Sequence, residues 1–411
     1  MTPPSGARTA TARRGSAHTP RRGSGPTVRR GSAPAARPKG RRLGGRPAGR
    51  RSASFTILLT LVVILTLIGL VMVLSASYAT AYYEYGSSWY QFKRQLIWVA
   101  LGTVAMVVIM RVDYRRWRRY TNLLLVVALG LMVAVMVPGL GVNVNGSSRW
   151  LGFGQFRVQP SELAKLAVLM FAADLLARRA DRVDNLKLTL RPVLVVFAVF
   201  AVLLMMQPNL GTTILLGSIV FVMLFVSGVA VKPLVGSFGA GAGLAVVAAV
   251  AEPYRFRRLM AFLNPWKDPQ NTGYQTIQSQ IAAAHGGLTG SGIGHSIAKF
   301  GFLPYAQTDF IFAIVADELG FIGAVLLIAL FIAVGVVGVR IALHAPDRYG
   351  MLLATGITTW VLFQAFVNIG AVVGVLPITG VPLPFVSFGG SSLVVVLAAM
   401  GIELSIARQA R

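Results

Sequence analysis

Residues 55–77 have the sequence FTILLTLVVILTLIGLVMVLSAS, an apolar run without a single charged side chain. About 20 such residues in a helix span the roughly 30 Å hydrocarbon core of a bilayer, and a helix satisfies its own backbone hydrogen bonds there. The run is too long for the apolar part of a signal peptide, and no small-residue cleavage site clearly follows it. We therefore expect residues 55–77 to form a first transmembrane helix.

Similar apolar segments recur through the rest of the chain. Of its 411 residues, 55% are hydrophobic and only 13% are charged, and the mean hydropathy is +0.68. This composition excludes an ordinary soluble globular protein. The sequence predicts an all-α polytopic membrane protein of about ten transmembrane helices. The expected spans are 55–77, 93–110, 121–138, 160–178, 191–207, 210–228, 231–250, 309–340, 349–375 and 386–407.

The net charge of +26 is concentrated at the N-terminus, where 14 Lys and Arg residues lie in the first 54 positions and no acidic residue precedes Glu84. Residues 1–53 are rich in Arg, Gly, Pro and Ser and have almost no bulky apolar side chain, so we expect a disordered basic tail, followed by a membrane domain over residues 54–411. The tail has no aromatic residue on which bases could stack, which argues against a nucleic-acid partner.

Short loops rich in Lys and Arg face the cytoplasm in most membrane proteins. The tail and the loops near 111–119, 178–187, 232, 340–348 and 408–411 all fall on one side of the predicted bundle, so we expect both termini to be cytoplasmic. The segments left outside are 78–92, 139–159, 252–308 and 376–385. The long extracytoplasmic loop 252–308, between the seventh and eighth helices, is an exception to the charge rule. Its cations, which suggest an anionic ligand, are Arg255, Arg257, Arg258, Lys267 and Lys299.

The sequence lacks the residues that thiolate chemistry and a zinc site require. The chain has no cysteine and only four scattered histidines, which excludes thiolate chemistry and disfavours a zinc site. The glycine-rich runs 286–294 (GGLTGSGIG) and 388–392 (FGGSS) either expose amides to phosphate or serve close packing. Neither is followed by G-K-[ST], so we expect no nucleotide site.

The first candidate site lies in residues 139–165, GLGVNVNGSSRWLGFGQFRVQPSELAK. Arg149 and Arg157 precede a membrane helix whose first turn contains Pro160. Glu162 and Lys165, three residues apart, lie on one face of that helix near the membrane boundary. They form either a structural ion pair or a direct contact with substrate.

The second candidate site is Asp309, which a polar, glycine-rich segment places at the start of a long apolar helix. A carboxylate there could act as a general base, hold a divalent ion or cap the helix. Asp317 and Glu318 lie two turns deeper, and we expect them to pack or relay rather than to catalyse.

The tail carries a third motif, RRGS, at residues 13–16, 21–24 and 29–32. Ser16, Ser24 and Ser32 therefore resemble sites of basophilic kinases. Phosphate at these positions would weaken attraction between the tail and anionic lipid, although a merely solvated basic tail explains the same pattern.

Four long stretches resemble the FtsW/RodA/SpoVE family, also called the SEDS family. They are VNGSSRWLGFGQFRVQPSELAKL (144–166), QPNLGT (207–212), LPYAQTDFIFAIVADELG (303–320) and FVNIGAVVGVLPITGVPLPFVSFGGSS (366–392). The resemblance covers nearly everything after the tail. IGLVMVLSAS (68–77) and FKRQLIWVALG (92–102) favour the FtsW branch over the RodA branch.

The resemblance implies a peptidoglycan glycosyltransferase of the plasma membrane that polymerises lipid II, with undecaprenyl diphosphate as leaving group. It implies that the protein acts at the division septum together with a class B penicillin-binding protein and other divisome proteins. A Mg²⁺ or Mn²⁺ cofactor is compatible with this activity. A lipid II flippase and a RodA-like role in elongation are the alternatives.

The family's candidate catalytic carboxylate falls on Asp309. Its substrate-cavity residues fall on Arg149, Arg157, Gln159, Ser161, Glu162, Lys165, Lys299, Ser387, Ser391 and Ser392. Two positions depart from the family pattern, because Gln307 stands where many members have His and Asn209 where many have Asp.

Overall fold

The structure is a computed structural model, and it describes residues 53–410 except 145–146, 154–155, 184, 252–255 and 257–259. The predicted tail, with Ser16, Ser24 and Ser32, lies outside the described residues apart from Ala53, the first residue of the first helix. The loop arginines Arg255, Arg257 and Arg258 also lie outside them.

All ten predicted spans are helices, which confirms the all-α polytopic prediction. The helices are α1 (Ala53–Tyr85), α2 (Tyr90–Arg111), α4 (Thr121–Ala134), α5 (Pro160–Arg178), α6 (Leu190–Met206), α7 (Leu210–Val226), α8 (Val231–Ala251), α11 (Ile311–Leu343), α12 (Arg348–Val372) and α13 (Ser391–Gln409). Shorter elements are α3 (Tyr114–Trp117), α10 (Tyr274–His285) and the 3₁₀ turns η1 (Arg118–Tyr120), η2 (Ala180–Arg182) and η3 (Pro265–Lys267).

The helices differ in how well they match a bilayer. Among the described residues, five are long and apolar enough to cross a membrane unaided, namely α1, α2, α11, α12 and α13. Helices α6 and α7 and the segment Val231–Val247 of α8 are apolar but shorter. Helix α5 has enough length at 19 residues, but it carries Glu162, Lys165 and Asp174. All three are buried, so α5 carries charged side chains into the interior of the bundle.

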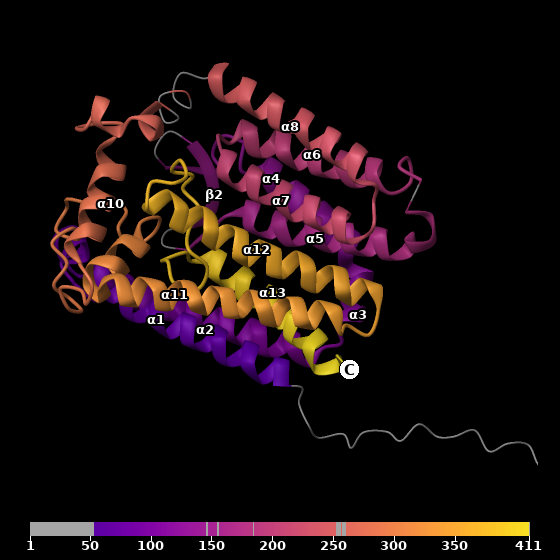
Figure 1. Cartoon of the computed structure of the whole chain (residues 1–411), viewed down its shortest axis with the longest axis horizontal. Coiled ribbons are helices and arrows are strands. Elements are labelled where there is room, and N and C mark those ends of the chain that lie inside the picture. The colour runs from indigo at the N-terminus through magenta and orange to yellow at the C-terminus, as the bar shows by residue number, and fades with distance from the viewer. Residues whose placement is uncertain are drawn as a thin grey trace, which may run out of the picture. The chain divides into compact units, whose positions relative to one another are not determined.

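The helices run side by side, and α1, α2, α11, α12 and α13 pack together beside α4, α5, α6, α7 and α8 (Figure 1). One end of the bundle carries α10, β2 (Ser147–Phe153) and the segment 376–390 (Figure 1). We call it the loop end. The opposite end carries α3, the start of α12 and the C-terminus, and we call it the basic end because its connections are rich in Arg and Lys.

The loops at the loop end differ from the prediction. Helix α1 continues to Tyr85 and α2 begins at Tyr90, so the connection expected over residues 78–92 is reduced to 86–89. The segment 139–159 forms an antiparallel three-stranded sheet of β1 (Gly141–Val144), β2 and β3 (Phe156–Val158). Helix α13 begins at Ser391 rather than 386, because Gly390 before it has a φ of +48°.

Close packing brings the segment 376–390 into the bundle. A Cβ atom on Gly69 of α1 would lie 2.3 Å from the carbonyl oxygen of Phe385. Only glycine permits that approach. The buried side chains of α1 therefore share one core with Phe385 and Val386 of the loop end.

Candidate functional site

The first predicted pair lies at the start of α5, which begins with Pro160 in its first turn. Lys165 Nζ is 2.9 Å from Glu162 Oε2, and the side chains are 1% and 3% exposed. In so apolar a place an unpaired charge is costly, and the pairing satisfies both groups. The predicted ion pair is present in the structure.

Helix α12 completes the surroundings of Lys165. Its ammonium donates to Gln364 Oε1 at 3.1 Å and lies 4.7 Å from the centre of the Trp360 ring. The Trp360 indole donates to the same Gln364 oxygen at 2.7 Å, and the Gln364 amide donates to the carbonyl of Pro382. The buried charge is thus linked to the segment 376–390.

The predicted serines join α5 to the start of α13. Ser392 Oγ donates to Glu162 Oε2 at 2.9 Å, and the backbone N–H of Gln159 donates to Ser391 Oγ at 3.0 Å. Ser387 Oγ donates to the carbonyl of Thr308 at 2.5 Å. Hydrogen bonds therefore link α5 to α12 and α13, and the backbone of residues 382–387 continues the connection to the residue before Asp309.

Asp309 lies at the junction of α11 with this network. The N-cap position of α11 is occupied by Phe310, the residue that follows Asp309. Asn368 Nδ2 donates to the Asp309 carbonyl at 2.8 Å and to the carbonyl of Val381 at 2.9 Å. A Cβ on Gly380 would lie 3.7 Å from Asp309 Oδ2, so the half-buried carboxylate faces the segment 376–390.

The other predicted residues near α5 have different surroundings. Arg149, on β2, donates from Nε to the carbonyl of Gln207 at 2.8 Å and from a terminal nitrogen to the carbonyl of Pro208 at 2.6 Å. Arg157 is exposed on β3. Ser161 is buried, and its hydroxyl has no hydrogen-bond partner among the described residues. Among the cations assigned to the substrate cavity, Arg157 is thus the exposed one.

Lys299 makes its contacts in a second cluster rather than around Glu162. Its Nζ lies 3.1 Å from Glu318 Oε1, donates to the carbonyl of Gly294 at 2.5 Å and lies 3.4 Å from Ser75 Oγ. The side chain is 2% exposed. The neighbouring carboxylate of Asp317 lies 2.8 Å from His285 Nδ1. Asp317 and Glu318 therefore pack and pair, as expected from the sequence.

The glycine-rich run 286–294 packs against a break in α11. Gly320 has a φ of 67° and a ψ of −170° inside that helix. The backbone N–H groups of Ser291 and Gly292 donate to the carbonyls of Asp317 and Glu318, at 2.9 and 3.0 Å. These two amides are occupied, so at this point the structure supports close packing over phosphate binding.

Sequence reasoning missed the contributions of α12 and of Arg94. Trp360, Gln364 and Asn368 recur every four residues of an apolar helix, which places them on one face. That spacing of polar groups was an available signal for an interior site. The Arg94 guanidinium, on α2, lies 5.7 Å from the centre of the Phe388 ring.

A metal ion would find few ligands in the chain itself. Among the described residues no three His, Asp or Glu side chains gather into a metal site. Mg²⁺ is commonly held by one or two carboxylates together with substrate phosphates. The described residues therefore fit a Mg²⁺ ion that Asp309 and the substrate phosphates would hold together.

These features define a polytopic α-helical membrane protein whose polar, buried network ends at a carboxylate on one end of the bundle. The sequence profile of the FtsW, RodA and SpoVE cell cycle proteins matches residues 55–411. The chain belongs to this family.

Named relatives resemble the chain over most of its length. It is 43% identical to stage V sporulation protein E of Bacillus subtilis, over 88% of this chain and 99% of that protein. It is 42% identical to a probable peptidoglycan glycosyltransferase FtsW of Geobacter metallireducens, over 85% of this chain and 93% of that protein. A chain in the solved structure of a peptidoglycan synthase complex, described as coordinating polymerization and crosslinking, matches with a TM-score of 0.70 at 29% identity, over 86% of this chain and 97% of that chain.

Proposed function

We propose that this protein is a peptidoglycan glycosyltransferase that polymerises lipid II into glycan strands, with undecaprenyl diphosphate as the leaving group. The observation that carries the proposal is the placement of Asp309. Its backbone is fixed by Asn368, and its carboxylate faces the segment 376–390. Membership in a family with relatives named peptidoglycan glycosyltransferase supports the activity.

In the proposed reaction the Asp309 carboxylate accepts the proton of the acceptor GlcNAc 4-hydroxyl. The hydroxyl oxygen attacks the anomeric carbon of the donor MurNAc, and the bond from that carbon to the diphosphate breaks with inversion. Arg157 and Arg149 bind the departing diphosphate electrostatically. A Mg²⁺ or Mn²⁺ ion, where bound, would neutralise part of the same charge, with Asp309 as its ligand from the protein.

The buried network has a positioning role in this proposal. Ser387 and Asn368 hold the carbonyls of Thr308 and Asp309, and the Glu162–Lys165 pair reaches Ser387 through Gln364 and the segment 376–390. A rigid framework of this kind keeps a general base within reach of its proton. Lys299 is paired with Glu318, so in this structure it supports the loop rather than the diphosphate.

We further propose that the loop end faces the outside of the cell and that both termini are cytoplasmic. The cations of the basic end agree with that orientation. A class B penicillin-binding protein is the proposed partner, which the likeness to a chain of a peptidoglycan synthase complex supports. The relatives named FtsW favour a site of action at the division septum.

Glycan polymerisation from purified lipid II, resolved on gels with the cognate partner present, tests the proposal. We expect Asp309→Ala and Asp309→Asn to reduce polymer by about 100-fold or more, the usual contribution of a general base. Asp268→Asn is the matched control, because this carboxylate lies in the same loop and accepts hydrogen bonds from its neighbours Asn271 and Thr272.

Each outcome has a different meaning. Undiminished polymer from both Asp309 variants would move the base to another residue while keeping the enzyme. Failure of folded wild-type protein to polymerise with its partner would contradict glycosyl transfer, and it would favour lipid II transport.

A further inference from the structure

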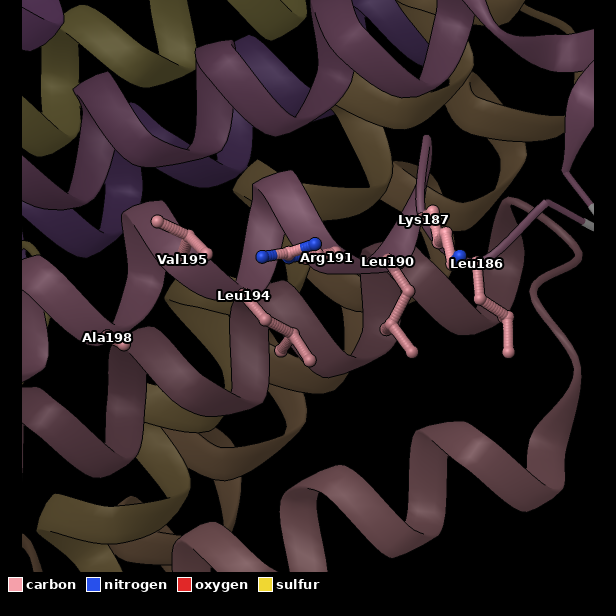
Figure 2. A pocket seen from close by; sticks show the side chains of 7 residues that line it. All are labelled: Leu186, Lys187, Leu190, Arg191, Leu194, Val195 and Ala198. Carbon is pink, nitrogen blue, oxygen red and sulfur yellow. The ribbon is translucent and has the colours of Figure 1, made fainter.

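A groove lies beside the first turns of α6, at the basic end of the bundle and so opposite the end that carries Asp309. Its volume is about 370 Å³, near the lower limit of about 300 Å³ for small-molecule sites. The leucines Leu186, Leu190 and Leu194 point to one side of α6 in Figure 2. The hydrocarbon portions of these residues make the wall apolar.

Two cations border this apolar wall. Lys187 and Arg191 also line the groove, and their nitrogen atoms lie along the side away from the leucine tips (Figure 2). Both side chains are exposed, and neither makes an ion pair with a described residue. Their charges are therefore exposed at the border of the apolar wall rather than inside the groove.

The length of α6 places these cations at the membrane surface. The helix has 17 residues, which corresponds to about 26 Å at 1.5 Å per residue. This is less than the roughly 30 Å thickness of the hydrocarbon core. A short span draws the headgroup region toward its ends, and long basic side chains reach up to meet it.

We propose that the groove binds an anionic glycerophospholipid of the leaflet at the basic end. Part of one acyl chain lies along Leu194, Val195 and Ala198, and the phosphate lies between Lys187 and Arg191. The volume accommodates part of a chain, and the remainder stays in the bilayer. Placement in the inner leaflet depends on the proposed orientation, and the choice of a glycerophospholipid over a polyprenyl phosphate rests on the proposed function.

The charge pattern and the apolar wall together select this occupant. A soluble anion would use the two cations and leave the leucines exposed, whereas a neutral lipid would use the leucines alone. A polyprenyl phosphate offers the same two chemical features. It is disfavoured as the occupant because this groove opens at the end of the bundle opposite Asp309, where the proposed reaction consumes the lipid-linked sugar.

Native mass spectrometry of the full chain, released from detergent with added phosphatidylglycerol or phosphatidylcholine, tests the proposal. We expect phosphatidylglycerol to bind in preference. Lys187→Gln/Arg191→Gln should weaken its binding by about tenfold or more, since each surface cation contributes substantially to attraction of anionic lipid. Arg116→Gln/Arg119→Gln is the matched control, because it removes the same charge from exposed arginines at the same end and should leave the affinity unchanged.

A second variant examines the apolar wall. Leu194→Trp fills the groove on a partly exposed face and should lower phosphatidylglycerol binding with both cations intact. Monodispersity in detergent verifies that the variants are folded. Lipid II polymerisation reports separately on the proposed activity.

Four results would overturn the proposal. They are equal binding of the two phospholipids, equal loss in the control pair, displacement of phosphatidylglycerol by inorganic phosphate, and tighter binding of undecaprenyl phosphate with the same dependence on Lys187 and Arg191.

Discussion

The protein buries two Lys–Glu pairs of almost equal geometry in different structural settings. The Glu162–Lys165 pair measures 2.9 Å and lies within one turn of α5. The Lys299–Glu318 pair measures 3.1 Å and joins residues of two segments, the loop before α11 and α11 itself. Both lysines are almost wholly inaccessible, so each pair carries a desolvation cost, and the pairs differ in what they hold together.

The partners of each pair indicate its purpose. Glu162 and Lys165 are aligned by their own helix, and their further hydrogen bonds to Ser392 and Gln364 reach the network that ends at Asp309. Glu318 instead accepts from Ser75 of α1 at 2.6 Å and from the backbone of Ser296. The first pair organises a site, and the second ties a loop to the bundle.

The largest expected effect on stability follows from breaking the second pair. Glu318→Gln leaves Lys299 buried without its anion and weakens the hold on Ser75, so we expect a loss of about 3–5 kcal/mol in stability. Thermal unfolding in detergent, monitored by size-exclusion chromatography, measures this loss of stability. Glu162→Gln should cost less, because Glu162 accepts from Lys165 and Ser392, whereas Glu318 accepts from Lys299, from Ser75 of α1 and from the Ser296 backbone. Equal losses would show that the difference in partners has no energetic weight.

Replacing both members of each pair separates stability from activity. Lys299→Met/Glu318→Leu should recover most of the lost stability, because packed apolar groups can replace a buried ion pair, and it should polymerise lipid II within about tenfold of wild type. Glu162→Leu/Lys165→Met should recover stability as well, yet lose about 100-fold in polymerisation, since Ser392 and Gln364 lose their partners. Similar activities in the two double variants would contradict the assignment of the first pair to the site.

The two pairs also show how far sequence alone could go. Glu162 and Lys165 were predictable as a pair because three residues on a helix bring two side chains to one face. The partner of Lys299 was not, because a distance of 19 residues across a loop has no fixed geometry. The family resemblance assigned Lys299 to the substrate cavity, and the structure places it against Glu318.

Helix positions were predictable for a related reason. An apolar segment inside a bilayer satisfies its backbone hydrogen bonds as a helix, so each of the ten expected spans contains a helix. The extension of α1 to Tyr85 and the sheet β1–β3 were not, because outside the hydrocarbon core hydropathy no longer determines the backbone. The Asn145-Gly146 dipeptide between two valine-containing and aromatic stretches is a hairpin signal that could have indicated the strands.

The next prediction concerns the loop that packs into the break in α11. A Cβ on Gly290 would lie 2.2 Å from the Glu318 carbonyl oxygen, at a φ of +87°. Gly294 has a φ of +88° with nothing within 4 Å of its added Cβ. Gly294→Ala should therefore cost about 1–2 kcal/mol from backbone strain alone, and Gly290→Ala about 1–3 kcal/mol more from overlap. The same unfolding assay compares the two variants. Indistinguishable midpoints would mean that the loop shifts to accommodate the added methyl group at no cost in stability.

The smallest effect belongs to an ion pair that is not buried. At the basic end Asp347 caps α12, and its side chain is 35% exposed against 46% for its partner Arg115. Burial raises the pKa of the Asp347 carboxyl, but hydrogen bonds from the Gly350 amide, the Arg115 guanidinium and the Tyr114 hydroxyl outweigh it and hold the pKa below its ordinary value.

Because the folded-state pKa is depressed, the stabilisation is present above the unfolded-state pKa of about 3.9 and is lost as pH falls through the folded-state value. Asp347→Asn keeps a capping side chain, so its cost at neutral pH should be below about 1 kcal/mol, and 1 M salt should reduce it further. Unfolding midpoints of wild type and variant should converge on acidification below pH 4. The cost of Glu318→Gln should resist the same salt, because water and ions do not reach that pair. If 1 M salt reduced the stability cost of Glu318→Gln but not that of Asp347→Asn, the expected difference between the buried and the exposed ion pair would be contradicted.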